Sequence, residues 1–114
     1  MSPLQPTQGV YLRFFMHEGR RHHGVLLYEW LLREAKKLDI SGGTAFRSIA
    51  GFGRHGVMHE AHFLELAGQE TVRVDFVVTR EAADAMLARV RRENLQMFYA
   101  LLPAEFGVLG DGAQ

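Results

Sequence analysis

The sequence of 114 residues contains no cysteine. Disulfide bonds, catalysis by a thiolate, and zinc or iron–sulfur sites with cysteine ligands are therefore excluded. A chain without disulfides fits a reducing compartment, so we expect a cytoplasmic protein. The composition, with 47% hydrophobic and 23% charged residues, is that of a folded domain, and the length is enough for one domain only.

The sequence also lacks an excess of either charge and lacks a long apolar run. Thirteen Lys and Arg residues balance thirteen Asp and Glu residues, so the formal net charge is +0 and nucleic-acid binding is not expected. The longest apolar run, residues 97–102, is far shorter than the about 20 residues that cross a bilayer, so membrane insertion is not expected either. The N-terminus has no cationic start followed by an apolar stretch, and it does not resemble a secretion signal.

Hydrophobic periodicity predicts four strands and two helices. Residues 10–17 alternate with a period of two, as in a strand. Leu27, Leu31 and Ala35 recur at four-residue spacing, as in an amphipathic helix. The full set of expected elements is strands at 10–17, 44–52, 71–79 and 95–102 and helices at 24–38 and 80–92. This βαββαβ order predicts a ferredoxin-like α+β sandwich, with both helices on one face of a four-stranded antiparallel sheet.

One domain, residues 10–109, contains all of these elements. Residues 1–9 and 110–114 are expected to be flexible ends. Residues 54–70 form a connector longer than the about 12 to 15 residues usual in a compact domain, which indicates a binding loop.

The predicted sheet is apolar on both faces. Tyr11 and Phe15 lie opposite the other apolar set of their strand, and residues 95–102 carry apolar side chains on both sides. Two helices cover only one face, and another copy of the chain is the available cover for the other. We therefore expect a homo-oligomer.

Arginines in two segments are candidates for binding an anion. Arg20 and Arg21, with His23 beside them, precede a predicted helix whose free backbone N–H groups favour a phosphate. Arg47 lies near the end of the second strand, which can meet the exit of the first strand at a subunit boundary in this fold. The alternative is that Arg20 and Arg21 are solvated turn residues.

A glycine-rich segment closes the second strand. Gly51 and Gly53 flank Phe52, so backbone amides could approach a ligand on which the aromatic ring also packs. The segment lacks the lysine of a phosphate loop and the third glycine of a dinucleotide fingerprint. The alternative is a hinge between the sheet and the long connector.

His55, His59 and His62 raise a metal hypothesis, because on a helix this spacing would place them on one face. Gly53 and Gly56 disfavour a helix here, and an extended chain leaves at most two ligands together. Surface or packing roles in the loop are therefore favoured, although an intersubunit site could collect ligands from several copies. We expect no metal or other cofactor. No pair of catalytic carboxylates and no activated nucleophile is recognisable, so no enzyme is expected.

Four segments form a recognisable set: residues 12–15 (LRFF), 18–24 (EGRRHHG), 27–29 (LYE) and 47–53 (RSIAGFG), with His59 beyond them. Together they resemble the uncharacterised branch of the PII-like signalling superfamily, over about residues 10–102. The resemblance implies ferredoxin-like domains assembled as trimers, with ligands such as adenine nucleotides bound between subunits. It also implies that the loop at 54–70, with Arg54, His55 and His59, contacts a partner such as a membrane transporter, a channel or an enzyme.

Two family features are missing from this sequence. The glycine-rich loop with lysine that holds phosphates in typical PII members would precede the last strand, where residues 91–94 are RREN. The cysteine pair of the carboxysome-associated relatives is absent as well. The expected function is a non-enzymatic sensor, a homotrimer that binds a small anionic ligand and regulates a partner through its loop. The alternative is a metal-binding or metal-tolerance protein of the same architecture that uses the loop histidines.

Overall fold

The computed structural model describes residues 5–52, 58–60 and 70–110, the second of these ranges as backbone only. Within these ranges the helices are α1 (Leu27–Lys37) and α3 (Arg80–Arg92). The strands are β1 (Thr7–His17), β2 (Arg21–His22), β3 (Val25–Leu26), β4 (Thr44–Arg47), β5 (Ala50–Phe52), β6 (Met58–Glu60), β7 (Thr71–Val78) and β8 (Phe98–Phe106).

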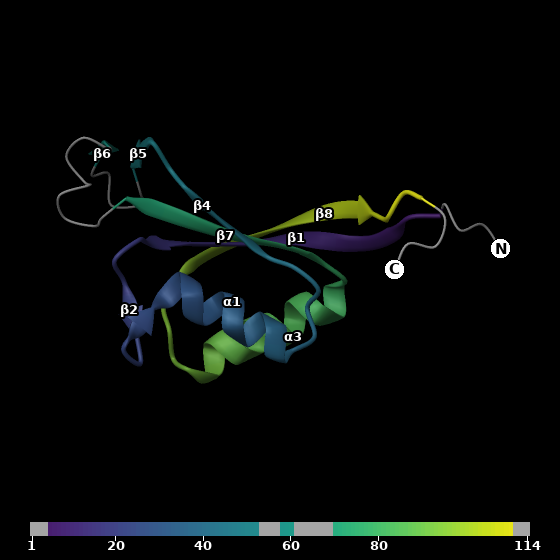
Figure 1. Cartoon of the computed structure of the whole chain (residues 1–114), viewed down its shortest axis with the longest axis horizontal. Helices are drawn as coiled ribbons and strands as arrows, with labels where there is room; N and C mark the ends of the chain where they lie inside the picture. Colours follow the sequence, from purple (N-terminus) through teal and green to yellow (C-terminus); the bar gives the residue numbers. More distant parts are fainter. Residues whose placement is uncertain (1–4, 53–57, 61–69, 111–114) are drawn as a thin grey trace.

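The main sheet has the strand order β4-β7-β1-β8, and every neighbouring pair is antiparallel. At its centre, Phe14 of β1 lies opposite Val74 of β7 and Tyr99 of β8. Both helices cover the same face of this sheet (Figure 1). The predicted ferredoxin-like α+β fold is confirmed. Among the described helices, none has the length and hydropathy needed to cross a bilayer.

The core lies between the sheet and the two helices. Leu12 and Phe14 of β1 point into it and are almost fully buried, and the Phe14 ring meets the edge of Phe76 at 6.4 Å. Leu27 of α1 and Met86 of α3 close it from the helix side with no exposed surface. Each of these side chains contributes about 1.5 to 3 kcal/mol through the apolar surface it removes from water.

The second helix begins where the sequence predicts. Thr79 precedes α3, and its Oγ1 accepts a hydrogen bond from the backbone N–H of Ala82 at 3.1 Å. This satisfies one of the N–H groups that have no partner in the first turn of a helix. The helix ends before Asn94, whose φ of 59° is the left-handed conformation common after a helix C-terminus.

The first helix begins at Leu27, so the predicted start at residue 24 is wrong. The two preceding segments pair as a hairpin, with Arg21 opposite Leu26 and the two-residue turn formed by His23 and Gly24. Both turn residues have positive φ, 53° and 80°, which is the signature of a type I′ turn. Gly24 therefore serves a hairpin turn and does not open a helix.

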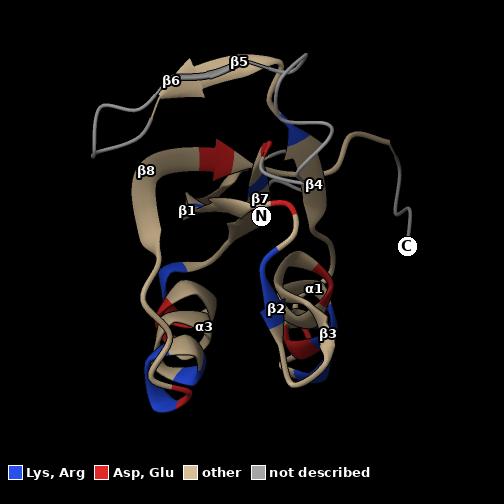
Figure 2. Cartoon of the chain, turned by 90° about the vertical axis from the view of Figure 1, so that its left-hand side faces the viewer, with Lys and Arg blue, Asp and Glu red and all other residues tan. Residues whose placement is uncertain are grey.

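The predicted strand 44–52 is two separate strands. β4 ends at Arg47, and the chain then leaves the main sheet while the N–H of Ser48 donates to the carbonyl of Thr71 at 2.8 Å. β5 pairs instead with β6, and this hairpin lies on the side of the sheet opposite the helices (Figures 1 and 2). β6 falls within the predicted connector 54–70, most of which lies outside the described residues.

The outer strands are longer or shifted relative to the prediction. β1 begins at Thr7, within the end that was expected to be flexible. β8 runs from Phe98 to Phe106 and passes through Pro103, which the periodicity had placed at its end. Proline is tolerated there because β8 is an edge strand, where one side of the backbone needs no ladder partner.

The sheet face away from the helices has aromatic residues around a charged centre. The rings of Phe15 and Phe98 lie 5.5 Å apart, and Phe46 and Phe98 remain 46% and 49% exposed. The neighbouring row of the sheet, where Arg13 lies opposite Asp75, has an ion pair between Arg13 and the buried Asp75 at 3.6 Å. Most charged residues belong to the helix layer (Figure 2). The expected apolar character of this face is present at its ends and interrupted at its centre.

Candidate functional site

Most of the predicted ligand-binding segments lie at one end of the sheet, opposite the chain termini (Figure 1). β1 and β4 end there and β7 begins there. The β2–β3 hairpin lies there on the helix side of the sheet and the β5–β6 hairpin on the other side.

An ion pair of Arg47 and Glu18 holds the ends of β4 and β1 together. Arg47 Nε donates to Glu18 Oε1 at 2.9 Å, and Nη2 donates to Oε2. The hydrogen bonds from Arg47 lower the pKa of the Glu18 carboxyl. The Arg47 side chain is still 62% exposed, and a guanidinium has five N–H donors, so donors remain for an anion.

Arg20 and Arg21 each donate to a backbone carbonyl. Arg20 Nη1 bonds the carbonyl of Gln96 at 2.6 Å, which links the turn after β1 to the segment before β8. Arg21 Nη1 bonds the carbonyl of Gly24 at 2.9 Å and closes its own hairpin. The helix N-terminus expected beside them is not there, because α1 begins later and the N–H of Leu27 already donates to the carbonyl of Arg20. Any anion site here therefore depends on the arginine side chains.

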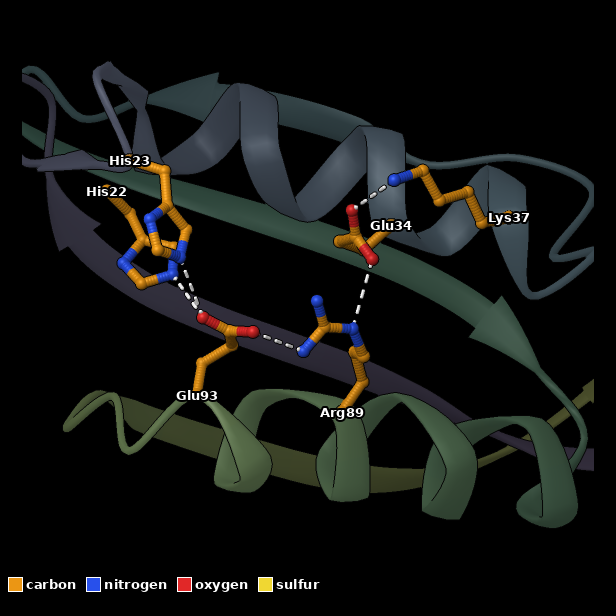
Figure 3. Close-up of polar contacts among 6 residues, drawn as sticks. All are labelled: His22, His23, Glu34, Lys37, Arg89 and Glu93. Atoms are coloured by element: carbon orange, nitrogen blue, oxygen red, sulfur yellow. Dashed lines mark hydrogen bonds and ion pairs between the residues drawn. The ribbon is translucent and has the colours of Figure 1, made fainter.

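The two adjacent histidines of the β2–β3 hairpin converge on one carboxylate (Figure 3). The Nε2 atoms of His22 and His23 lie 2.8 and 3.0 Å from Oε1 of Glu93, the C-cap residue that follows α3. The exposed fractions of the three side chains are 14%, 68% and 22% respectively. These three residues are also the described group whose ligand atoms are close enough to hold a metal ion, within 4.8 Å of one another.

A chain of charged side chains continues from Glu93 between the two helices (Figure 3). Arg89 Nη1 donates to Glu93 Oε2 at 2.7 Å, and Arg89 Nε donates to Glu34 Oε1 at 3.0 Å. Lys37 donates to the other oxygen of Glu34 at 2.9 Å. The bonds from Arg89, His22 and His23 lower the pKa of Glu93 to about 2, so this carboxylate is ionised at neutral pH.

In the described part of the glycine-rich segment, a Cβ on Gly51 would meet no atom within 4 Å. Gly51 and Phe52 belong to β5, where they pair with the backbone of His59 and Met58, and Phe52 is 70% exposed. Gly53, Arg54, His55 and His62 lie outside the described residues. The convergence of the arginines with this segment stays a prediction, as does metal binding by the loop histidines.

A hollow at the C-terminal end of α1 is separate from the arginines. It is lined by residues that include Leu32, Ile40 and Phe76. Gly43 forms part of its wall, and a Cβ there would lie 2.4 Å from the Phe76 ring, so the close approach requires glycine.

Sequence reasoning missed Glu18, Arg89 and Glu93. Glu93 lies 71 residues from His22, and Arg89 lies 55 residues from Glu34. No spacing rule connects residues so far apart, because the fold alone brings them together. A His-Gly pair between two short segments is a local signal for a hairpin turn, and it was the clue that Gly24 does not open a helix.

The family is shown by comparison with known proteins. Residues 9–98 match the DUF190 family, described as "Uncharacterized ACR". The chain belongs to this family. A UPF0166 protein of Aquifex aeolicus (strain VF5) is 29% identical over 83 residues, which cover 73% of this chain and 79% of that protein.

Solved structures of PII-like proteins share the fold. CPII, a nitrogen regulatory PII-like protein from Thiomonas intermedia K12 bound to ADP, AMP and bicarbonate, matches with a TM-score of 0.67 at 15% identity, over 92% of this chain and 93% of that one. A PII-like protein from Thermus thermophilus matches with a TM-score of 0.64 at 18% identity, over 91% and 94% of the two chains. The resemblance to an uncharacterised branch of the PII-like superfamily is confirmed.

Proposed function

We propose that this chain is a non-enzymatic, cytoplasmic PII-like regulatory protein. It forms a homotrimer, binds a small anionic ligand of the adenine nucleotide class in clefts between subunits, and regulates a partner through residues 54–70. The observation that carries this proposal is the similarity over 92% of the chain to CPII, whose structure holds ADP, AMP and bicarbonate.

The exposed sheet face supports assembly. Phe46, Phe98 and Leu102 are 46%, 49% and 39% exposed on strands whose other face is core. Aromatic and aliphatic surface of this kind is stabilised by contact with another copy, since apolar area removed from water contributes about 25 cal/mol per Å².

The arginines at the end of the sheet support anion binding. The guanidinium groups of Arg20, Arg21 and Arg47 donate to acceptors of the protein. These bonds use only some of the five N–H donors of each group. Arginine binds phosphate through paired N–H donors, and this does not require a glycine-rich phosphate loop. His23 and the backbone amides of residues 51–53 are the other groups proposed to bind the anion. A neighbouring copy of the chain would have to place them close to the arginines.

Two apolar side chains support contact with a partner on the far side of the sheet. Residues 48–52, which we call the arm, lead from the end of β4 into residues 54–70. On this arm Ile49 and Phe52 are 85% and 70% exposed. A membrane transporter, a channel or an enzyme is the class of partner that this loop would engage. The nucleotide would control that contact only by binding one arrangement of the arm more tightly than another.

Titration calorimetry with ADP, AMP, ATP and bicarbonate tests the ligand class. Arg20→Ala and Arg47→Ala are each expected to weaken nucleotide binding by about ten- to a hundredfold, because a charge-assisted hydrogen bond contributes about 1.5 to 3 kcal/mol. Arg80→Ala is the matched control, since Arg80 pairs with Asp84 on the surface at the start of α3, the end of this helix that is farther from β2 (Figure 1). Light scattering on the same samples should report a trimer for all variants.

Two results would overturn the assignment. An unaltered protein that binds none of the nucleotides has no adenine nucleotide site. Equal affinity in the Arg20, Arg47 and Arg80 variants would show that the arginines at the end of the sheet do not hold the anion.

A further inference from the structure

We infer that His22, His23 and Glu93 bind a divalent transition-metal ion, with Zn²⁺ the expected occupant, between the β2–β3 hairpin and the C-terminal end of α3. The site uses none of the loop histidines of the earlier metal hypothesis. It also needs neither a nucleotide nor a second copy of the chain, so it stands apart from the proposed function.

The three donor groups already lie close together, with both histidines directed at one oxygen of Glu93 (Figure 3). Both imidazole Nε2 atoms lie within 3.0 Å of Glu93 Oε1, and all three atoms lie within 4.8 Å of one another. Ligand atoms on a tetrahedral Zn²⁺ with bonds of about 2.0 to 2.1 Å are about 3.3 Å apart. Each Nε2–Oε1 distance would therefore have to increase by about half an ångström or less around an ion. The lone pair of each Nε2 would then replace the N–H that now donates to the carboxylate.

The backbone is shaped so that two consecutive histidines point the same way. Neighbouring residues of a strand point to opposite faces. His23 escapes this rule because it adopts a φ of 53° in the turn, and its ring lies 4.0 Å from that of His22. The type I′ turn, which requires this φ, therefore places both rings on the side of Glu93.

A second layer of contacts orients the ligands. Arg89 bonds Oε2 of Glu93 and leaves Oε1 facing the histidines, and Arg89 is itself held by Glu34. The His22 ring meets the edge of Trp30 at 4.9 Å, in a nearly perpendicular contact that limits its rotation. Outer contacts of this kind, which fix ring orientation and carboxylate geometry, usually accompany metal ligands.

The donor set selects the class of ion. Two imidazole nitrogens and one carboxylate oxygen suit Zn²⁺, Co²⁺, Ni²⁺ and Cu²⁺, whereas Mg²⁺ and Ca²⁺ prefer oxygen ligands only. Three protein ligands leave one position of a tetrahedral ion for water or another small ligand. The 68% exposure of His23 provides access from solvent.

The single tryptophan of the chain gives a local signal for binding. Ni²⁺ and Cu²⁺ quench indole fluorescence at short range, and Trp30 contacts His22 directly. We expect saturable quenching by Ni²⁺ in the nucleotide-free protein, its reversal by Zn²⁺, and calorimetry that reports one Zn²⁺ per chain.

Variants decide whether these residues are the ligands. His23→Ala and Glu93→Gln are each expected to weaken Zn²⁺ and Ni²⁺ binding at least tenfold, and Glu93→Gln keeps the size of the side chain. The triple variant His55→Ala, His59→Ala and His62→Ala is the matched control and should keep the quenching of Trp30. A thermal melt of each variant checks that it is folded.

Three outcomes would overturn the assignment. The first is no saturable quenching of the unaltered protein by Ni²⁺. The second is unchanged affinity in both His23→Ala and Glu93→Gln, which would leave the cluster as a hydrogen-bonded contact only. The third is loss of the quenching in the triple loop variant. Because no nucleotide is present in these titrations, their failure would not bear on the anion site.

Discussion

The ion pair between the helices is the feature whose removal has the clearest expected cost. Glu34 of α1 is 7% exposed and accepts hydrogen bonds from Arg89 of α3 and from Lys37 of its own helix. Arg89→Met would leave the buried carboxylate with Lys37 alone, and it would remove the guanidinium that lies 5.1 Å from the Trp30 ring.

The magnitude follows from how buried the partners are. Removing one partner of a fully buried pair costs about 3 to 5 kcal/mol, because the other charge stays buried and unpaired. Lys37 remains, and the Arg89 side chain is 22% exposed, so we expect a loss of about 2 to 3 kcal/mol in the free energy of unfolding. Replacing both members, with Glu34→Leu added, should recover part of this loss.

Urea denaturation at one fixed protein concentration measures the effect, since the stability of an oligomer depends on concentration. Arg80→Met is the matched control on the same helix, where the pair with Asp84 is more than half exposed and is expected to contribute less than about 0.5 kcal/mol. If Arg89→Met lowered the free energy of unfolding no more than Arg80→Met, the bond from Arg89 would not stabilise the buried carboxylate of Glu34, and the reasoning would be refuted.

Three further predictions address assembly, capping and pH. Phe98→Asp should convert the proposed homotrimer to monomers in light scattering, because it places a charge on the exposed aromatic face; an unchanged mass would place the interface elsewhere. Thr79→Ala should lower the free energy of unfolding by about 1 kcal/mol in urea, with Thr79→Ser retaining most of the cap to Ala82. Folding lowers the pKa values of Glu18 and Glu34, mainly through hydrogen bonds from Arg47 and Lys37 respectively. On acidification these two carboxylates are therefore protonated at a higher pH in the unfolded chain than in the folded chain. Stability should therefore be retained above the ordinary value of 4.5 and be lost as the pH falls below it, and a urea midpoint independent of pH in this range would contradict this sign.

The fold was predictable because its signals are local. Hydrophobic periodicity indicates which face of an element is buried, even when the element that covers it is unknown. Such periodicity is present in residues 10–17 and 71–79, with a period of two, and in residues 27–37, with four-residue spacing. Thr79 marks the start of a helix in the same way, through a hydrogen bond to a residue three positions later. The order of such elements is enough to predict a ferredoxin-like sandwich.

Element boundaries were not predictable where tertiary contacts decide them. Residues 44–52 are continuously compatible with a strand, yet β7 begins at Thr71, so the bond from the N–H of Ser48 to the carbonyl of Thr71 is the last that this strand can make to it, and the chain then leaves the sheet. Pro103 usually ends a strand, and it is accepted in β8 only because that strand lies at the edge. Neither fact is visible before the neighbours are known.

The site was predictable only in part, for the same reason. The sequence indicates which side chains can bind an anion or a metal, and Arg20, Arg47 and His23 were recognised on that basis. It does not indicate which carboxylates lie beside them. Glu18 accepts hydrogen bonds from Arg47, which uses part of the donors of that arginine. Glu93, about 70 residues further along the chain, accepts hydrogen bonds from the histidines.

The two proposed sites share the segments that they hold in place. Arg20 bonds the carbonyl of Gln96, while His22 and His23 bond Glu93, so the chain after β1 is joined at two points to the chain before β8. A cation on the histidines and an anion on Arg20 would each favour one arrangement of this pair of segments. Because coupling between two ligands is reciprocal, any factor by which the metal changes the affinity for the nucleotide is also the factor by which the nucleotide changes the affinity for the metal. A metal that shapes the anion site would tighten nucleotide binding, whereas a metal that stabilises only the hairpin would leave it unchanged. The measured coupling, more than either affinity alone, therefore distinguishes a regulatory ion from a structural one.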